Sequence, residues 1–140
     1  MFLPPRVEFY DGICRTPPYP LLLEAHSELL AKGWTDPVTM VSWDNLAFVA
    51  FNGDTPIAVL SFAFAKWAKQ VDVQIGWVDP QHRRRGVYRL LWERLVEKSR
   101  ELGAVAIFGS THVDNKTLQA VAARLGRVQA GVLFRFDITA

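Results

Sequence analysis

The sequence lacks several features that would assign it to a common class of protein. Cys14 is the only cysteine among 140 residues, which excludes a disulfide framework and a zinc site built on cysteines. No apolar run reaches the roughly 18 residues that a membrane span needs. The first residues do not form the basic start and apolar stretch of a signal peptide. We therefore expect a cytoplasmic protein that does not enter a membrane.

An excess of one charge is also missing. The chain has 16 basic and 14 acidic residues, and a net charge of +2 gives no argument by itself for nucleic acid as a partner. The pI of about 8.9 leaves that option open. Half of the residues are hydrophobic and 12% are aromatic, a composition that excludes disorder. Without a linker or repeat, residues 1–140 are expected to form a single domain.

Hydrophobic periodicity predicts a short strand, a helix, three consecutive strands, and then a helix, a strand, a helix and a strand. The expected strands span residues 6–10, 46–51, 56–67, 71–78, 104–110 and 132–138, and the expected helices residues 20–32, 86–102 and 115–125. Asn52 and Gly53 predict a two-residue hairpin turn. The later strand–helix–strand succession implies a parallel pair with a right-handed crossover. The fold class is therefore α/β (α+β), with a mixed, mostly antiparallel sheet flanked by helices.

The strand at residues 71–78 has an unusual polar side. Simple alternation places Asp72, Gln74, Gly76 and Val78 on one face of the sheet. A polar face on a central strand is unusual, and it is interpreted either as a functional site or as ordinary sheet packing.

The segment after this strand carries the clearest chemical signal. Arg83, Arg84 and Arg85 precede Gly86 at the start of the longest amphipathic helix. A helix N-terminus presents unpaired N–H groups and a partial positive charge, so arginines beside it favour a phosphate or pyrophosphate. A solvated basic loop is the alternative interpretation. The spacing matches neither GxxxxGK[ST] nor GxGxxG, which excludes a P-loop and a dinucleotide fingerprint.

This segment resembles the acyl-CoA signature of the GNAT N-acyltransferases, in which an Arg/Gln-x-x-Gly-x-Gly/Ala loop opens a helix. Arg83 and Gly86 match the first two positions, while Tyr88 stands where the family has glycine or alanine. The order of the expected elements agrees with the family over residues 40–138. The resemblance implies that acetyl-CoA or a related acyl-CoA is the co-substrate, with no metal. It also implies that the parallel strands splay to admit the pantetheine arm, helped by a bulge at Gly76.

The resemblance assigns the CoA contacts to the end of the strand, the loop and the cap of the last helix. The residues are Val78, Arg83, Arg84, Arg85, Gly86, Val87, Tyr88 and Asn115. The amide of Val78 would polarise the thioester carbonyl. Asn115 is expected to cap its helix whether or not it also contacts CoA.

The candidate catalytic groups are less complete. By its position Asp72 resembles the family's general base and would act through a water, although a solvent-facing strand carboxylate is the alternative. The tyrosine that commonly protonates the leaving thiolate is replaced here by Ala122. Tyr88, His112 or solvent would then supply the proton, or the step needs no dedicated acid. His112 is a candidate because imidazole suits acid–base work near neutral pH. A loop histidine with structural hydrogen bonds is the alternative for His112.

Five tryptophans are many for 140 residues. In similar folds, four of them would surround the acceptor cleft, namely Trp34, Trp43, Trp67 and Trp77. Gln74, Trp34 and Trp67 are the candidate substrate-contacting residues. Filling of the core is the alternative, and it is favoured for Trp77 and Trp92.

We therefore expect an N-acetyltransferase in which an amine of a small molecule or a protein attacks acetyl-CoA directly. One alternative, supported by Tyr88 and Ala122, is a catalytically impaired protein that binds CoA or a partner. Another is an enzyme that acts on nucleic acid through the basic segment and the tryptophans. One expected strand after Gly126, where the family has two, leaves an unpaired edge that favours a homodimer.

Overall fold

The computed structural model describes residues 4–14, 16–34 and 46–138. Trp43, one of the four tryptophans expected around the acceptor cleft, lies outside the described residues.

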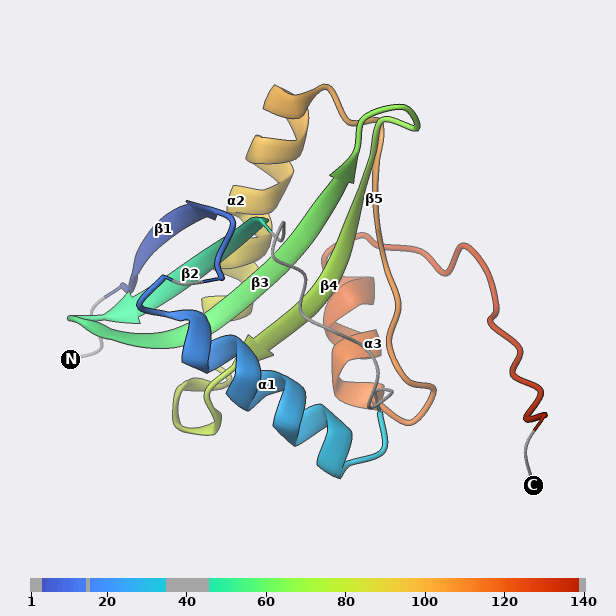
Figure 1. Cartoon of the computed structure of the whole chain (residues 1–140), viewed down its shortest axis with the longest axis horizontal. Helices are drawn as coiled ribbons and strands as arrows, with labels where there is room; N and C mark the ends of the chain where they lie inside the picture. Colours follow the sequence, from blue (N-terminus) through green and yellow to red (C-terminus); the bar gives the residue numbers. More distant parts are fainter. Residues whose placement is uncertain (1–3, 15, 35–45, 139–140) are drawn as a thin grey trace.

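A five-stranded sheet forms the centre of the molecule (Figure 1). Its strands, in spatial and sequence order, are β1 (Arg6–Asp11), β2 (Leu46–Asn52), β3 (Thr55–Ala65), β4 (Gln70–Val78) and β5 (Ala106–Gly109). The first four strands pair antiparallel, and β5 pairs parallel to β4. The mixed, mostly antiparallel sheet expected from the sequence is therefore confirmed.

Helices cover both faces of this sheet (Figure 1). They are α1 (Tyr19–Ala31), α2 (Val87–Leu102) and α3 (Lys116–Arg124), with a short 3-10 helix, η1 (Pro80–His82), before α2. Leu91 and Leu95 of α2 join one hydrophobic core with Phe62 of β3, and Leu125 at the end of α3 packs against the same core. Leu22 of α1 belongs to a second core on the opposite face. In the described part of the chain, no helix combines the length and apolar character needed to cross a membrane.

The hairpin between β2 and β3 differs by one residue from the expectation. Asn52 pairs with Thr55, so the two central turn residues are Gly53 and Asp54 instead of Asn52 and Gly53. Gly53 takes the positive φ of 62° at the first central position, which suits glycine. The Asn-Gly signal therefore locates the hairpin but not the register of its strands.

The expected alternation along β4 is wrong because the strand contains a bulge. Ser61 pairs with Ile75 while Phe62 pairs with Val73, which leaves Gln74 as the extra residue. A bulge reverses the direction of the side chains that follow it. Val71 lies in the core on the α2 face, whereas Ile75 lies in the core on the α1 face.

The candidate residues of β4 therefore divide between two faces. Asp72 lies on the α1 face, and Gly76 and Val78 lie on the α2 face. The bulge itself is at Gln74, two residues before the expected position at Gly76.

The end of the chain also differs from the expectation. Residues 132–138, expected as a final strand, have no regular secondary structure, and β5 is shorter than residues 104–110. Among the described residues, no strand pairs with the outer edge of β5. Alternating side chains alone do not make a strand, since its backbone needs a partner for its hydrogen bonds.

Candidate functional site

The loop that leads into α2 has the backbone form of an anion-binding site. Gly86 is the N-cap with a φ of 76°, and no side chain caps this end of the helix. The amide of Leu90 makes the first hydrogen bond of the helix, to the carbonyl of Gly86 at 3.1 Å. The amides of Val87 and Tyr88, in the first turn, therefore have no partner within the helix. Arg84 has a φ of 63°, an uncommon conformation for a residue with a side chain.

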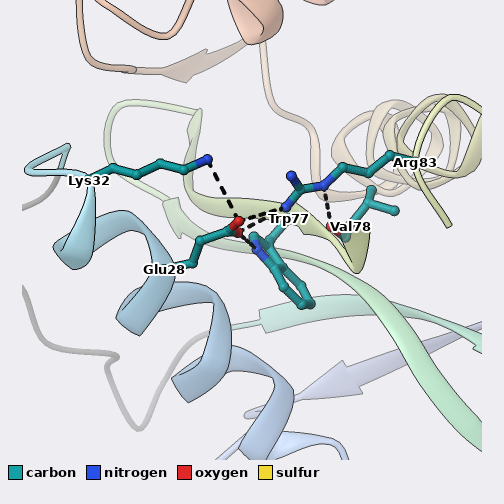
Figure 2. A network of polar contacts seen from close by, with 5 residues as sticks. All are labelled: Glu28, Lys32, Trp77, Val78 and Arg83. Carbon is teal, nitrogen blue, oxygen red and sulfur yellow. Dashed lines mark hydrogen bonds and ion pairs between the residues drawn. The ribbon is translucent and has the colours of Figure 1, made fainter. Parts of the chain in front are cut away.

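Arg83 does not extend into this loop but binds α1 (Figure 2). Its Nε donates to the carbonyl of Val78 at 2.8 Å, and its Nη2 donates to both carboxylate oxygens of Glu28 at 2.9 and 3.2 Å. Trp77 donates its indole N–H to the same carboxylate, and Lys32 lies 3.6 Å from it. Glu28 thereby connects α1 with the end of β4 and with the loop.

The electrostatics of this network favour an ionised Glu28. Its partial burial raises the pKa of the carboxyl, but the hydrogen bond from Trp77 and the positive charge of Arg83 outweigh this, and the pKa of Glu28 is lowered. The sequence analysis did not identify Glu28. The indole N–H of a buried Trp77, which requires an acceptor, is the signal that could have indicated a partner.

The other two arginines lie on the outside of the loop. Arg84 and Arg85 are exposed. Arg85 and Gly86 line a shallow surface hollow together with Pro5, Arg89 and Glu93. A second hollow lies between α2 and α3, with Arg100 and Arg124 among its lining residues. Both hollows border α2 and contain arginines together with Glu93, so the positive charge of this face is partly offset.

Tyr88, which replaces the expected glycine or alanine, points inward onto β4. A methyl group added to Gly76 would lie 2.7 Å from Cε2 of Tyr88 and 3.3 Å from its hydroxyl oxygen. Burial raises the pKa of the phenol, although the charge of Arg127 opposes the rise. Tyr88 is therefore a neutral hydroxyl group at physiological pH, packed on a strand that has room for it only because residue 76 is glycine.

Arg127, at the end of α3, meets Tyr88 from the side of β5. Its Nη1 donates to the Tyr88 hydroxyl oxygen at 3.3 Å. A methyl group on Gly109 would lie 2.7 Å from Nη2 of Arg127, and the guanidinium stacks 4.5 Å over the ring of Trp92. The sequence analysis did not identify Arg127. Gly76 and Gly109 lie on the neighbouring strands β4 and β5, and this pair of glycines is the signal that could have indicated large side chains packed over the two strands.

Asp72 lies on the opposite face of the sheet, close to the point where β4 and β5 separate. The two strands pair as far as Val73 and Gly109, and β4 then continues to Val78. Asp72 is half-buried, and its Oδ1 accepts a hydrogen bond from the side-chain Nε2 of Gln70 at 2.6 Å. Gln74, at the bulge, is exposed. The acidic and amide candidates thus lie at the separation point and not beside the loop.

His112 and Trp34 come together from distant parts of the chain. Their rings stack with centroids 6.2 Å apart, which brings the end of α1 against the segment after β5. The Nδ1 of His112 accepts from the amide of Asp114 at 3.1 Å, which leaves Nε2 for another contact. Asn115 caps α3 by accepting from the amide of Leu118 at 3.1 Å, as expected.

The remaining candidates lie apart from these groups. Trp67 is 92% exposed in the turn between β3 and β4, at the end of β4 that is remote from Val78. Trp77 and Trp92 are buried, which confirms the expectation of core tryptophans. Ala122 is on α3, and Tyr88 is the nearest tyrosine in sequence to the loop. No group of three or more metal-ligating side chains occurs within residues 4–14, 16–34 and 46–138.

Comparison with known proteins agrees with this arrangement. The sequence model of the acetyltransferase (GNAT) family matches residues 7–126. No curated protein matches the chain.

Solved structures of the same fold are numerous, but their sequences have diverged. A GCN5-related N-acetyltransferase from Ralstonia eutropha JMP134 is similar with a TM-score of 0.74 at 16% identity, covering 96% of this chain and 99% of that one. An aminoglycoside acetyltransferase from an uncultured soil metagenomic sample, in complex with trehalose, is similar with a TM-score of 0.71 at 14% identity. The match covers 97% of this chain and 96% of that one. A ribosomal-protein-alanine N-acetyltransferase from Brucella melitensis biovar Abortus 2308 has a TM-score of 0.71 at 11% identity. The match covers 96% of this chain and 99% of that one. At such identities the likeness concerns the fold alone.

Proposed function

The chain belongs to the acetyltransferase (GNAT) family, and on this premise we propose that it transfers an acetyl group from acetyl-CoA to an amine. The amine nitrogen attacks the thioester carbonyl, a C–N bond forms, the C–S bond breaks, and CoA leaves as the thiol. One proton departs from the amine and one arrives at the sulfur. The observation that carries the proposal is the uncapped N-terminus of α2 behind Gly86 and beside Arg84.

This helix end suits the pyrophosphate of acetyl-CoA. The amides of Val87 and Tyr88 supply donors, and the exposed Arg84 and Arg85 supply charge. Arg83 has a different role in this proposal, because Glu28 and the carbonyl of Val78 already accept its hydrogen bonds. It would hold the end of β4 and the loop in position.

The two faces of the sheet would receive the two substrates. Acetyl-CoA would lie on the face of α2 and α3, and the amine would approach from the α1 face where β4 and β5 separate. Asp72 is on that side, next to the exposed Gln74. The Trp34–His112 stack lies at the end of α1, where it could contact an acceptor. Proximity and a polarised carbonyl would provide most of the rate acceleration.

Two protons need residues of this chain. Asp72, directly or through a water, would accept the proton of the amine. His112 would offer its Nε2–H as a hydrogen-bond donor, because its Nδ1 already accepts from the amide of Asp114. Tyr88 would donate the proton to the thiolate, since burial keeps its hydroxyl protonated. This assignment gives the only tyrosine of α2 the role that the family gives to a tyrosine at the position of Ala122.

A non-catalytic, CoA-binding protein is the second candidate function. The specific observation that favours it is the Tyr88–Arg127 pair, which lies over Gly76 and Gly109 on the face where the pantetheine arm would pass. If acetyl-CoA is to reach the separation point, these side chains must move. An acetyltransferase would release CoA thiol in the presence of an amine, whereas a binding protein would not.

Titration calorimetry with acetyl-CoA, followed by a CoA-thiol release assay with a panel of amines, tests the proposal. Arg84→Glu reverses the charge at the proposed phosphate site and is expected to weaken binding at least tenfold. Arg94→Glu is the matched control, because Arg94 is exposed on the same helix but away from its N-terminus. Equal weakening by both variants would contradict the proposed phosphate site.

A further inference from the structure

The C-terminal segment has the pattern of a strand but no place in the sheet. In residues 132–138 the apolar side chains Val132, Phe134, Phe136 and Ile138 alternate with Leu133, Arg135 and Asp137. All five large apolar side chains within residues 132–138 are exposed, with Phe134 and Phe136 at 89% and Ile138 at 91%. Several large apolar side chains exposed on one short segment indicate an interaction site.

The outer edge of the sheet could accept such a strand. β5 is the last strand of the sheet, and its outer edge has no partner strand among the described residues. Such an edge presents unpaired N–H and C=O groups to any extended chain. The helix beside it, α3, has no buried residue, although Leu118, Val121 and Ala122 form an apolar stripe along it. One strand added to β5 would pair this edge and cover this stripe.

The C-terminal segment begins beside the end of β5. Arg127 is anchored against Gly109, the last residue of β5, and against Tyr88. The chain after Arg127 then runs away from the body of its own subunit (Figure 1). A segment that leaves a subunit next to its open sheet edge is placed to enter the same edge of a symmetry-related copy.

We propose that the protein is a homodimer in which residues 132–138 of each copy form a strand on β5 of the other. The face of Val132, Phe134, Phe136 and Ile138 would cover the apolar stripe of the partner's α3, and Leu133, Arg135 and Asp137 would lie on the opposite face. Each chain supplies both the strand and the edge, so a twofold axis satisfies both copies at once. This proposal does not depend on the catalytic one.

The amount of apolar surface fits a stable dimer. Phe134 and Phe136 of the two copies together would bury roughly 600–1,000 Å² of aromatic surface. Valine, isoleucine and the two strand edges add to this, which brings the total near the roughly 1,200–2,000 Å² of a stable interface.

Size-exclusion chromatography with light scattering on the full chain, from about 1 to 100 μM, tests the proposal. The wild-type protein is expected to have the mass of a dimer, about twice 15.8 kDa. Phe134→Ser with Phe136→Ser is expected to shift the midpoint of dissociation by at least 100-fold or give a monomer. Arg135→Ser with Asp137→Ser is the matched control, because it changes the same segment on the opposite face without altering the net charge. The control variant should remain dimeric.

Hydrogen exchange of residues 132–138 completes the test. Protection of these amides is expected in the dimer and should be lost in the phenylalanine variant. A wild-type monomer at 100 μM would overturn the proposal, and protected amides in that monomer would instead mean that the segment pairs within its own subunit. A dimer that both double variants leave intact would place the interface elsewhere and would also overturn it.

Discussion

Arg127 donates a hydrogen bond to the hydroxyl oxygen of Tyr88, with 3.3 Å between Nη1 and the phenolic oxygen. This contact joins the end of α3 to the first turn of α2 across the face of β4 and β5. The two side chains lie over Gly76 and Gly109, the positions on each strand where a side chain would collide with them. The pair therefore connects the proposed phosphate site to the point where the strands separate.

The hydroxyl of Tyr88 is predicted to contribute to the chemical step. Tyr88→Phe keeps the ring on Gly76 and removes the proposed proton donor, so kcat should fall about 100-fold, within the usual range for an acid catalyst. The KM for acetyl-CoA should change less than about threefold. Steady-state thiol release with a saturating amine measures both constants. An unchanged kcat would show that the hydroxyl is not the acid.

Arg127→Ala is predicted to act on binding instead. The guanidinium itself lies over Gly109, so its removal leaves this face of β5 less obstructed, and the KM for acetyl-CoA should fall severalfold. Arg124→Ala, one turn earlier at the end of α3, is the control. A KM that rises in Arg127→Ala but not in the control would contradict a gating role and would indicate that Arg127 binds CoA.

The close contact between Gly76 and Tyr88 predicts a coupled stability effect. Gly76→Ala places a methyl group 2.7 Å from Cε2 of a packed ring, and overpacking of this kind costs about 1–3 kcal/mol of unfolding free energy. In a Tyr88→Ala background the same change should cost much less. Urea denaturation of the two single variants and the double variant gives this coupling. Gly131→Ala, where a methyl group meets nothing within 4 Å, should be neutral.

The Glu28 network predicts a pH dependence of stability. The pKa of Glu28 is lowered in the folded protein, so its contribution is fully present above the pKa of the unfolded chain and is lost as the pH falls through the folded value. Glu28→Gln should cost about 1 kcal/mol at pH 7, because solvent screens the half-exposed Arg83. The difference from wild type should shrink as the pH falls below the ordinary range of a glutamate carboxyl, because the folded protein then loses the ionised form. A difference that does not vary with pH would contradict the ionic role.

The uncommon backbone of Arg84 allows stability and binding to be separated. Its φ of 63° is a conformation that glycine adopts without strain. Arg84→Gly should therefore leave the unfolding free energy unchanged or raise it by up to about 1 kcal/mol, while the affinity for acetyl-CoA falls because a charge is lost. Thermal unfolding and calorimetry on the same samples test both parts. A loss of stability equal to the loss of affinity would contradict a direct role in binding.

Much of the fold could be predicted from the sequence because its signals are local. The apolar stripe of α2, the cap at Asn115 and the alternating strands all depend on neighbouring residues. The bulge at Gln74 could not be predicted in this way, since it depends on which residues of β3 and β4 pair. One inserted residue was enough to move Asp72 to the face opposite Gly76.

The site could be predicted only in part for a similar reason. The loop around Gly86 carries its own sequence signal, but Glu28 and Arg127 enter the site from elements far away in the chain. Residues 132–138 show the converse case. Their alternation correctly describes a segment able to form a strand, while its secondary structure depends on a partner that the local sequence does not supply.

Calorimetric titration of the 140-residue chain with acetyl-CoA tests the central claim most directly. We predict micromolar binding that Arg84→Glu weakens at least tenfold and Arg94→Glu does not. Absence of binding to the wild-type protein at millimolar acetyl-CoA would contradict the account, and would mean that the Tyr88–Arg127 pair closes the face on which the CoA was expected to lie.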